Sequence, residues 1–101
     1  MRIDVVGRDI PLTEAIKLHA QQKAEKLPKY CDGLQAVTVT IRKADQHHKP
    51  IFDVELVLDV EKHDDFVSHA KHEDLYAAID EAMHKGQRQL ADFKERLKGG
   101  R

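Results

Sequence analysis

A stripe of apolar residues in the last third of the chain places the strongest constraint on the fold. Its members recur at helical spacing and are Leu75, Ile79, Ala82, Met83, Leu90, Phe93 and Leu97. This period aligns their side chains along one side of an α-helix. Asp74 precedes the stripe and is the expected N-cap. A long helix with one apolar side needs an apolar layer to pack on, and the remaining sequence must provide that layer.

Alternating apolar and polar residues in the rest of the chain provide such a layer. Val37, Val39 and Ile41 alternate with polar neighbours, which places the three side chains on one face of a β-strand. The same kind of alternation, or a short β-rich run, recurs elsewhere in the chain. The pattern predicts strands over residues 1–6, 37–42, 52–60 and 66–71.

A second run with helical spacing lies between the first two predicted strands. Its apolar members are Leu12, Ile16, Ala20, Ala24 and Leu27. Thr13 is the expected N-cap, and Pro28 and Gly33 stand at the far end of the run. The spacing therefore predicts a helix of about four turns between Thr13 and Leu27.

The order of these elements is β-α-β-β-β-α, and it predicts an α+β fold. We expect a two-layer sandwich in which two helices pack on one face of a four-stranded mixed sheet. The first strand should run parallel to the second across the helical connection, and the last three strands should form a meander. Residues 1–98 form one domain in this prediction, and residues 99–101, which begin with Gly99-Gly100, form a disordered tail.

Charge and cysteine content limit the possible partners and compartments. The 17 Lys and Arg residues are balanced by 18 Asp and Glu residues, which argues against nucleic-acid binding through bulk positive charge. Any contact with RNA must then come from locally sorted charges. Cys31 is the only cysteine, and no apolar run is long enough to span a bilayer. We therefore expect a soluble, cytoplasmic protein that has no membrane partner.

Locally sorted positive charge occurs beside the apolar stripe of each predicted helix. The residues concerned are Lys23, Lys26 and Lys29 near the first helix and Lys85, Arg88, Gln89 and Arg96 on the second. If the helices pack side by side, the two flanks could meet and form a basic groove for RNA phosphates. The alternative is that these residues only solubilise the helix faces. Glu81 and Asp92, which share the flank of the second helix, favour that alternative.

The remaining polar residues give no basis for predicting chemistry. The histidines considered for a metal site are His47, His48, His63, His69 and His72, and their spacing matches no known ligand pattern. Cys31 and Ser68 lack the sequence context of a catalytic nucleophile. Tyr76 could cover the edge of the core or stack on a base. We therefore predict no catalysis, no metal, no cofactor and no small-molecule substrate.

Several segments together carry a resemblance to a known family. They are His72-Glu73-Asp74-Leu75-Tyr76-Ala77-Ala78-Ile79-Asp80, then Lys85 and Arg88-Gln89-Leu90, and, near the start, Gly7-Arg8, Leu12-Thr13-Glu14-Ala15-Ile16, Lys26-Leu27 and Lys29-Tyr30. The chain resembles the hibernation promoting factor and ribosome-associated inhibitor A family, which was earlier described as modulating sigma-54. The likeness covers nearly the whole chain and is closest to the short form.

The resemblance implies a function. Members of this family bind the small ribosomal subunit in the channel used by mRNA and tRNA, with basic helix residues on ribosomal RNA, and so block translation in stationary phase or stress. Short forms cooperate with ribosome modulation factor in pairing inactive ribosomes. Lys23, Lys26, Lys29, Lys85, Arg88 and Gln89 match the family's basic or polar contact positions. The other hypothesis is a regulatory protein-interaction module of the sigma-54 modulation type, without a direct role for RNA.

Two residues depart from the family pattern. Asp92 stands where a lysine is common, so it should weaken the RNA surface or shift it toward Lys94 and Arg96. Gly86 stands where a larger apolar residue is usual, and it should cost the helix about 1 kcal/mol relative to alanine.

Overall fold

The chain folds with the predicted order of strands and helices. The computed structural model describes residues 1–45 and 48–99. One short 3-10 helix, η1, adds to the expected elements. The elements are β1 (Arg2–Arg8), α1 (Glu14–Ala24), η1 (Leu27–Tyr30), β2 (Leu34–Lys43), β3 (Phe52–Val60), β4 (Phe66–His72) and α2 (Leu75–Gly99).

The strands form one four-stranded sheet in the order β1-β2-β3-β4. β1 runs parallel to β2, whereas β2 pairs with β3, and β3 with β4, in antiparallel fashion. The mixed sheet and its meander were both predicted, and the structure confirms them. Because the order is sequential, β1 and β4 are the two edges of this sheet.

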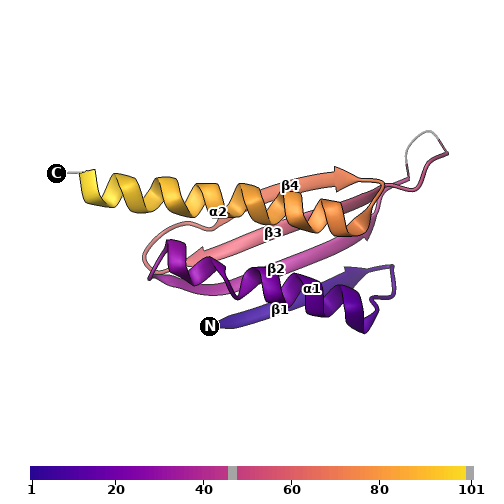
Figure 1. The fold of residues 1–101 in the computed structure, drawn as a ribbon, viewed down its shortest axis with the longest axis horizontal. Coiled ribbons are helices and arrows are strands. Elements are labelled where there is room, and N and C mark those ends of the chain that lie inside the picture. The colour runs from indigo at the N-terminus through magenta and orange to yellow at the C-terminus, as the bar shows by residue number, and fades with distance from the viewer. Residues whose placement is uncertain (46–47, 100–101) are drawn as a thin grey trace.

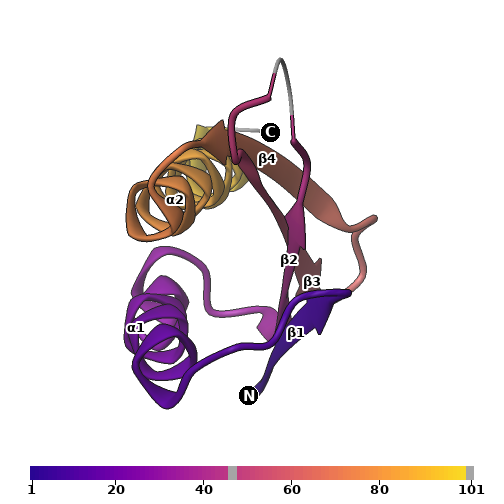
Figure 2. The ribbon, with the colours of Figure 1, turned by 90° about the vertical axis from the view of Figure 1, so that its right-hand side faces the viewer.

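Both helices cover the same face of the sheet, which gives the predicted two-layer sandwich (Figures 1 and 2). α1 packs on β1, and α2 packs on β3 and β4. Alternation along the strands directs residues such as Val39 and Leu56 toward the helices, where both are fully buried. The helices contribute Ala20, Ile79 and Leu90 to the same core. The opposite face of the sheet carries no helix in the described part of the chain.

The first helix is shorter than the spacing of apolar residues predicted. Its N-cap is Thr13, as expected, and the Thr13 hydroxyl accepts a hydrogen bond from the Ile16 N–H at 3.2 Å. It ends at Ala24, however, and Leu27 belongs to η1. Pro28 explains the difference, because proline disfavours α-helical backbone in the residue before it and has no N–H to continue the helix. Leu27 still reaches the core and is 2% exposed.

The second helix begins and extends as the stripe predicted, and continues slightly further. The Asp74 carboxylate accepts a hydrogen bond from the Tyr76 N–H at 3.0 Å, so Asp74 caps the helix as expected. α2 includes Gly99, which corrects the expected start of the tail at that residue, while residues 100–101 lie outside the described residues. Among the described residues, no helix has the length and apolar content needed to span a membrane.

At Gly86, the backbone of α2 lies very close to side chains of the sheet. A Cβ atom at this position would lie 2.5 Å from Leu56 Cδ2 and 3.2 Å from Leu58 Cδ1. Both leucines are fully buried, so neither end group can move freely. The sequence-based interpretation of Gly86 as a cost to the helix is therefore incomplete, because its missing side chain is what permits this close packing.

Candidate nucleic-acid interface

The predicted basic residues divide into two groups that occupy different surfaces. The first group surrounds a hollow of about 190 Å³ between α1, η1 and α2. From the α1 side this hollow is lined by Lys23, Lys26, Lys29 and Tyr30. From α2 it is lined by Asp80, Met83, His84 and Gln87, and not by the predicted cations of that helix. The structure thus brings the three lysines together with an acidic and neutral side of α2.

The second group lies on the other side of α2, along the free edge of β4. Lys85, Arg88, Gln89 and Asp92 line a groove of about 530 Å³ there, together with Val67, Ser68 and His69 from β4. Arg96 is also exposed and lies in the last turn of α2. The prediction that the basic flanks of the two helices meet in one groove is therefore wrong.

Helix geometry explains why the two groups separate. At about 100° per residue, Lys85 and Gln87 lie roughly 200° apart around α2, with the apolar stripe on one side between them. One flank of α2 must face α1 and the other must face the β4 edge. Because α1 packs on β1 at one edge of the sheet and α2 packs on β3 and β4, the flank with Lys85 faces outward.

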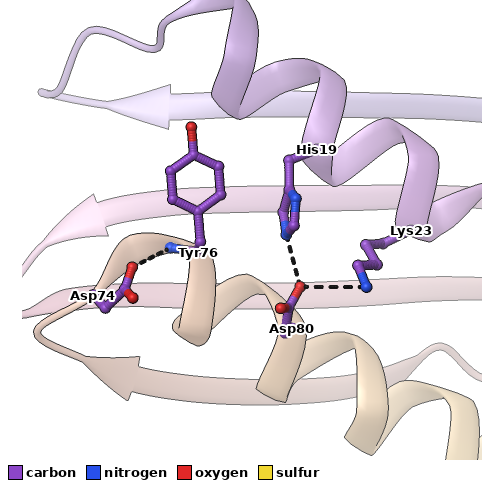
Figure 3. A network of polar contacts seen from close by, with 5 residues as sticks. All are labelled: His19, Lys23, Asp74, Tyr76 and Asp80. Atoms are coloured by element: carbon purple, nitrogen blue, oxygen red, sulfur yellow. Dashed lines mark hydrogen bonds and ion pairs between the residues drawn. The ribbon is translucent and has the colours of Figure 1, made fainter.

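Asp80 on α2 contacts two side chains of α1 (Figure 3). Its Oδ1 atom lies 2.7 Å from His19 Nε2 and 3.8 Å from Lys23 Nζ. The His19 ring also meets the Tyr76 ring edge-on at 4.9 Å between centroids. The Lys23 ammonium is thus partly neutralised, and Tyr76, which is 41% exposed, packs against α1 with one side of its ring.

The exposed lysines after Lys23 are less engaged. Lys26 and Lys29 are both exposed, and Lys29 Nζ lies 5.2 Å from the centroid of the Tyr30 ring. This distance is within the range of a cation–π contact. The ammonium groups of Lys26 and Lys29 are therefore better placed than that of Lys23 to meet an anionic partner.

The three α2 residues beside β4 differ in what their polar groups contact. Lys85 Nζ donates a hydrogen bond to the His69 carbonyl at 2.7 Å and lies 3.6 Å from Glu81 Oε1. Gln89 Nε2 donates to the Val67 carbonyl at 3.0 Å. Within residues 1–45 and 48–99, neither a hydrogen bond nor an ion pair engages the exposed Arg88 guanidinium. Arg88 is therefore the residue of this group whose charge is free to meet a phosphate.

The uncovered face of the sheet carries a third set of cations that the sequence reasoning missed. Arg8, Arg42, Asp53 and Lys71 are direct neighbours across all four strands. Asp53 Oδ2 lies 3.8 Å from Arg42 Nη2, and the Asp53 side chain is 13% exposed. Arg42 and Lys71 therefore flank the Asp53 carboxylate in this row, and Arg8 lies one strand beyond Arg42. The sequence shows that polar residues alternate along the strands. Only the register between the strands shows that these four residues lie in one row.

The histidines within residues 1–45 and 48–99 form no group that could hold a metal ion. His69 lies on β4, where its Nε2 atom is 3.7 Å from Glu55 Oε2. His63 instead stacks on Phe66, with 4.5 Å between ring centroids. His47, which was considered with them, lies outside the described residues.

Comparison with known proteins identifies the family. Residues 3–98 match the family described as Sigma 54 modulation protein / S30EA ribosomal protein. The chain belongs to this family. The resemblance noted from the sequence is thereby confirmed, and the match includes every described helix and strand except the first residue of β1 and the last of α2.

Individual members of the family are similar over nearly their full length. A protein from Escherichia coli K12 named ribosome hibernation promoting factor is 31% identical, and the alignment covers 97% of this chain and 98% of that protein. One of the same name from Azotobacter vinelandii is 32% identical over 95% of this chain and 85% of its own length.

Solved structures of related proteins share the fold. The N-terminal domain of Protein Y from Thermus thermophilus superposes with a TM-score of 0.79 and 28% identity, covering 92% of this chain and 99% of that one. A ribosomal subunit interface protein from Coxiella burnetii gives a TM-score of 0.82 at 18% identity, covering 94% and 99%. The second likeness supports the fold alone.

Proposed function

We propose that this family member is a ribosome hibernation factor, a binding protein rather than an enzyme, which acts in the cytoplasm. The observation that carries the proposal is the similarity over nearly the full length of both chains to relatives named ribosome hibernation promoting factor. The family description, which includes a ribosomal protein, agrees with it. The partner in this proposal is the small ribosomal subunit and its RNA.

The distribution of charge supports binding between RNA surfaces. Cations lie beside η1, along the β4 side of α2, and on the uncovered sheet face, so they point in several directions from one thin body. The molecule measures 51 × 26 × 18 Å along its principal axes. A body of this shape can occupy the channel for mRNA and tRNA and contact phosphates on more than one wall. Translation is then blocked because the channel is occupied.

The residues proposed to contact RNA are expected to contribute unequally to binding. Lys26, Lys29 and Arg88 have exposed, weakly engaged cationic groups, and Arg96 extends the α2 side. Lys23, Lys85 and Gln89 are already bonded within the protein, so they contribute less. Asp92 lines the same groove as Arg88 and repels phosphate there.

Binding of small ribosomal subunits at several salt concentrations tests the proposal. We expect the affinity to fall steeply as salt rises, because each phosphate contact releases counterions. Arg88→Met should weaken binding and lower the slope of log affinity against log salt by about 1. Lys17→Met is the matched control, since Lys17 is exposed on α1 away from both basic groups. Binding that is independent of salt, or equal loss in both variants, would contradict the proposal.

Pairing of inactive ribosomes is a separate part of the proposed function. We expect the protein, together with ribosome modulation factor, to increase the ribosome-dimer fraction in stationary phase. Sucrose-gradient sedimentation of ribosomes from cells with and without this protein measures the effect. An unchanged dimer fraction, with the protein still bound to small subunits, would limit its role to blocking initiation.

The family description also names sigma-54 modulation, which favours a second candidate function. A regulatory module of this type would bind a protein partner and would need no RNA. The formal net charge of −1 is compatible with such a partner. Affinity capture with and without ribonuclease separates the candidates, because a protein partner survives digestion whereas partners held through RNA are lost.

A further inference from the structure

Two side chains of α2 are bonded to the backbone along the outer edge of β4. Lys85 Nζ donates to the His69 carbonyl at 2.7 Å, and Gln89 Nε2 donates to the Val67 carbonyl at 3.0 Å. The residues are four apart on α2 and two apart on β4. Four helical residues rise about 6.0 Å and two strand residues span about 6.6 Å, so the two bonds match in spacing. Figure 1 shows α2 lying along β4 in this region.

The two carbonyls point away from the rest of the sheet. In an antiparallel pair, successive residues direct both their N–H and C=O groups alternately toward and away from the partner strand. Val67 and His69 face Val57 and Glu55 of β3, but their carbonyls are reached by α2 side chains. Both residues therefore direct their N–H and C=O groups to the outer edge, where a further strand would pair.

This edge has the features of a strand-pairing surface. β4 is the last strand of the sheet, and the Val67 side chain, on the uncovered face of this strand, is 43% exposed. An edge strand whose outward backbone groups have no strand partner is a template for another strand. A second copy of this chain offers the same edge, and two antiparallel β4 strands related by a two-fold axis would join their sheets. A second copy is therefore the partner that this edge fits.

We propose that Lys85 and Gln89 close the β4 edge against pairing with a second copy of this chain. Each side chain binds a carbonyl that an incoming strand would use, so it competes with that strand for the same acceptor and makes pairing less favourable. The β1 edge carries the charged residues Arg2, Asp4 and Arg8, whereas Lys71 is the one lysine of β4. Charged residues are another means by which edges avoid pairing. This role of Lys85 and Gln89 does not depend on ribosome binding.

The test removes both donors and keeps the bulk of the side chains. The variant Lys85→Met/Gln89→Leu should self-associate at a concentration at least about tenfold lower than the parent protein. One net hydrogen bond changes an association constant about tenfold, and the variant removes two competing bonds in each copy. Analytical ultracentrifugation over a concentration series measures this. The matched control is Arg88→Met, which removes one positive charge from the same groove but no backbone bond. It should stay monomeric wherever the parent does.

Hydrogen exchange locates the contact in the associated variant. The Val67 and His69 amides should gain protection as the concentration rises. Adding Val67→Pro should restore the monomer, because proline removes an outward N–H and leaves the ladder to β3 intact. If the double variant folds poorly, Gln89→Leu alone can be used instead. This single variant should self-associate more readily than the parent protein, but less than the double variant. A variant that remains monomeric, or that gains protection on β1 or the helices instead, overturns the proposal.

Discussion

Gly86→Ala sets helix propensity against packing, and the structure says which effect is larger. Alanine is favoured over glycine inside a helix by about 1 kcal/mol. Against this, the new Cβ would lie 2.5 Å from Leu56 Cδ2, closer than real contacts allow. Overpacking of this kind in a core costs about 1–3 kcal/mol, and Leu56 is fully buried. We therefore expect the substitution to lower the free energy of unfolding by about 1 kcal/mol net.

Thermal and urea unfolding measure this effect. For a domain of this size, 1 kcal/mol corresponds to a decrease in Tm of roughly 4–8 °C. Gly99→Ala is the control, because a Cβ at Gly99 meets no atom within 4 Å. The control should leave the free energy of unfolding unchanged or slightly higher. An increase in the stability of Gly86→Ala would show that α2 can move away from the sheet freely, and it would refute the reasoning.

A double-mutant cycle with Leu56→Val isolates the contact itself. Valine has no δ carbon, so it removes the atom that the new Cβ would meet. The single variant Leu56→Val should cost about 1 kcal/mol through lost packing. Gly86→Ala should then be less destabilising in the Leu56→Val background than in the parent. Strict additivity of the two changes would mean that the clash with Leu56 is not the cause.

Three further substitutions test other contacts. Ser68→Ala should lower the free energy of unfolding by about 1 kcal/mol in urea denaturation, because the buried Ser68 hydroxyl donates to the Ala82 carbonyl at 3.0 Å. Thr13→Ala should cost about 1 kcal/mol and speed hydrogen exchange in the first turn of α1, because it removes the N-cap bond to Ile16. Asp80→Asn should cost about 0.5 kcal/mol, since its hydrogen bond with His19 and its ion pair with Lys23 are partly exposed, and salt should reduce the part due to Lys23.

The fold was predictable because the apolar period changes sharply along this chain. Alternation in residues 52–60 and helical spacing after Asp74 each agree with the observed element, and the element order then leaves few topologies. The end of α1 was not predictable from spacing, because Leu27 is buried whether the backbone there is α-helical or 3-10. Packing energy depends on the buried side chain, whereas the backbone at this point is decided by Pro28.

Gly86 shows a different limit of sequence reasoning. Helix propensity assigns the residue a cost that is independent of its neighbours. The benefit of its missing side chain depends on Leu56 and Leu58, which lie on another element. The spacing of apolar residues in α2 does not show how close the helix lies to the sheet. From the sequence, Gly86 was therefore interpreted as a departure from the family pattern, although its missing side chain is what permits the close packing.

The grouping of basic residues on one flank of α2 was predictable, but the surface that this flank faces was not. A helical wheel correctly groups Lys85, Arg88 and Gln89 on one flank, yet it says nothing about whether that flank faces α1 or the β4 edge. Nor does it distinguish a lysine bonded to a strand carbonyl from an arginine whose charge is free. A match to a family's basic position therefore identifies only the type of residue. Its role depends on what its charged group contacts in the folded protein. Because Lys85 and Arg88 share one groove and carry the same charge, they should separate when measured side by side: Arg88→Met should affect ribosome binding most, and Lys85→Met should affect self-association most.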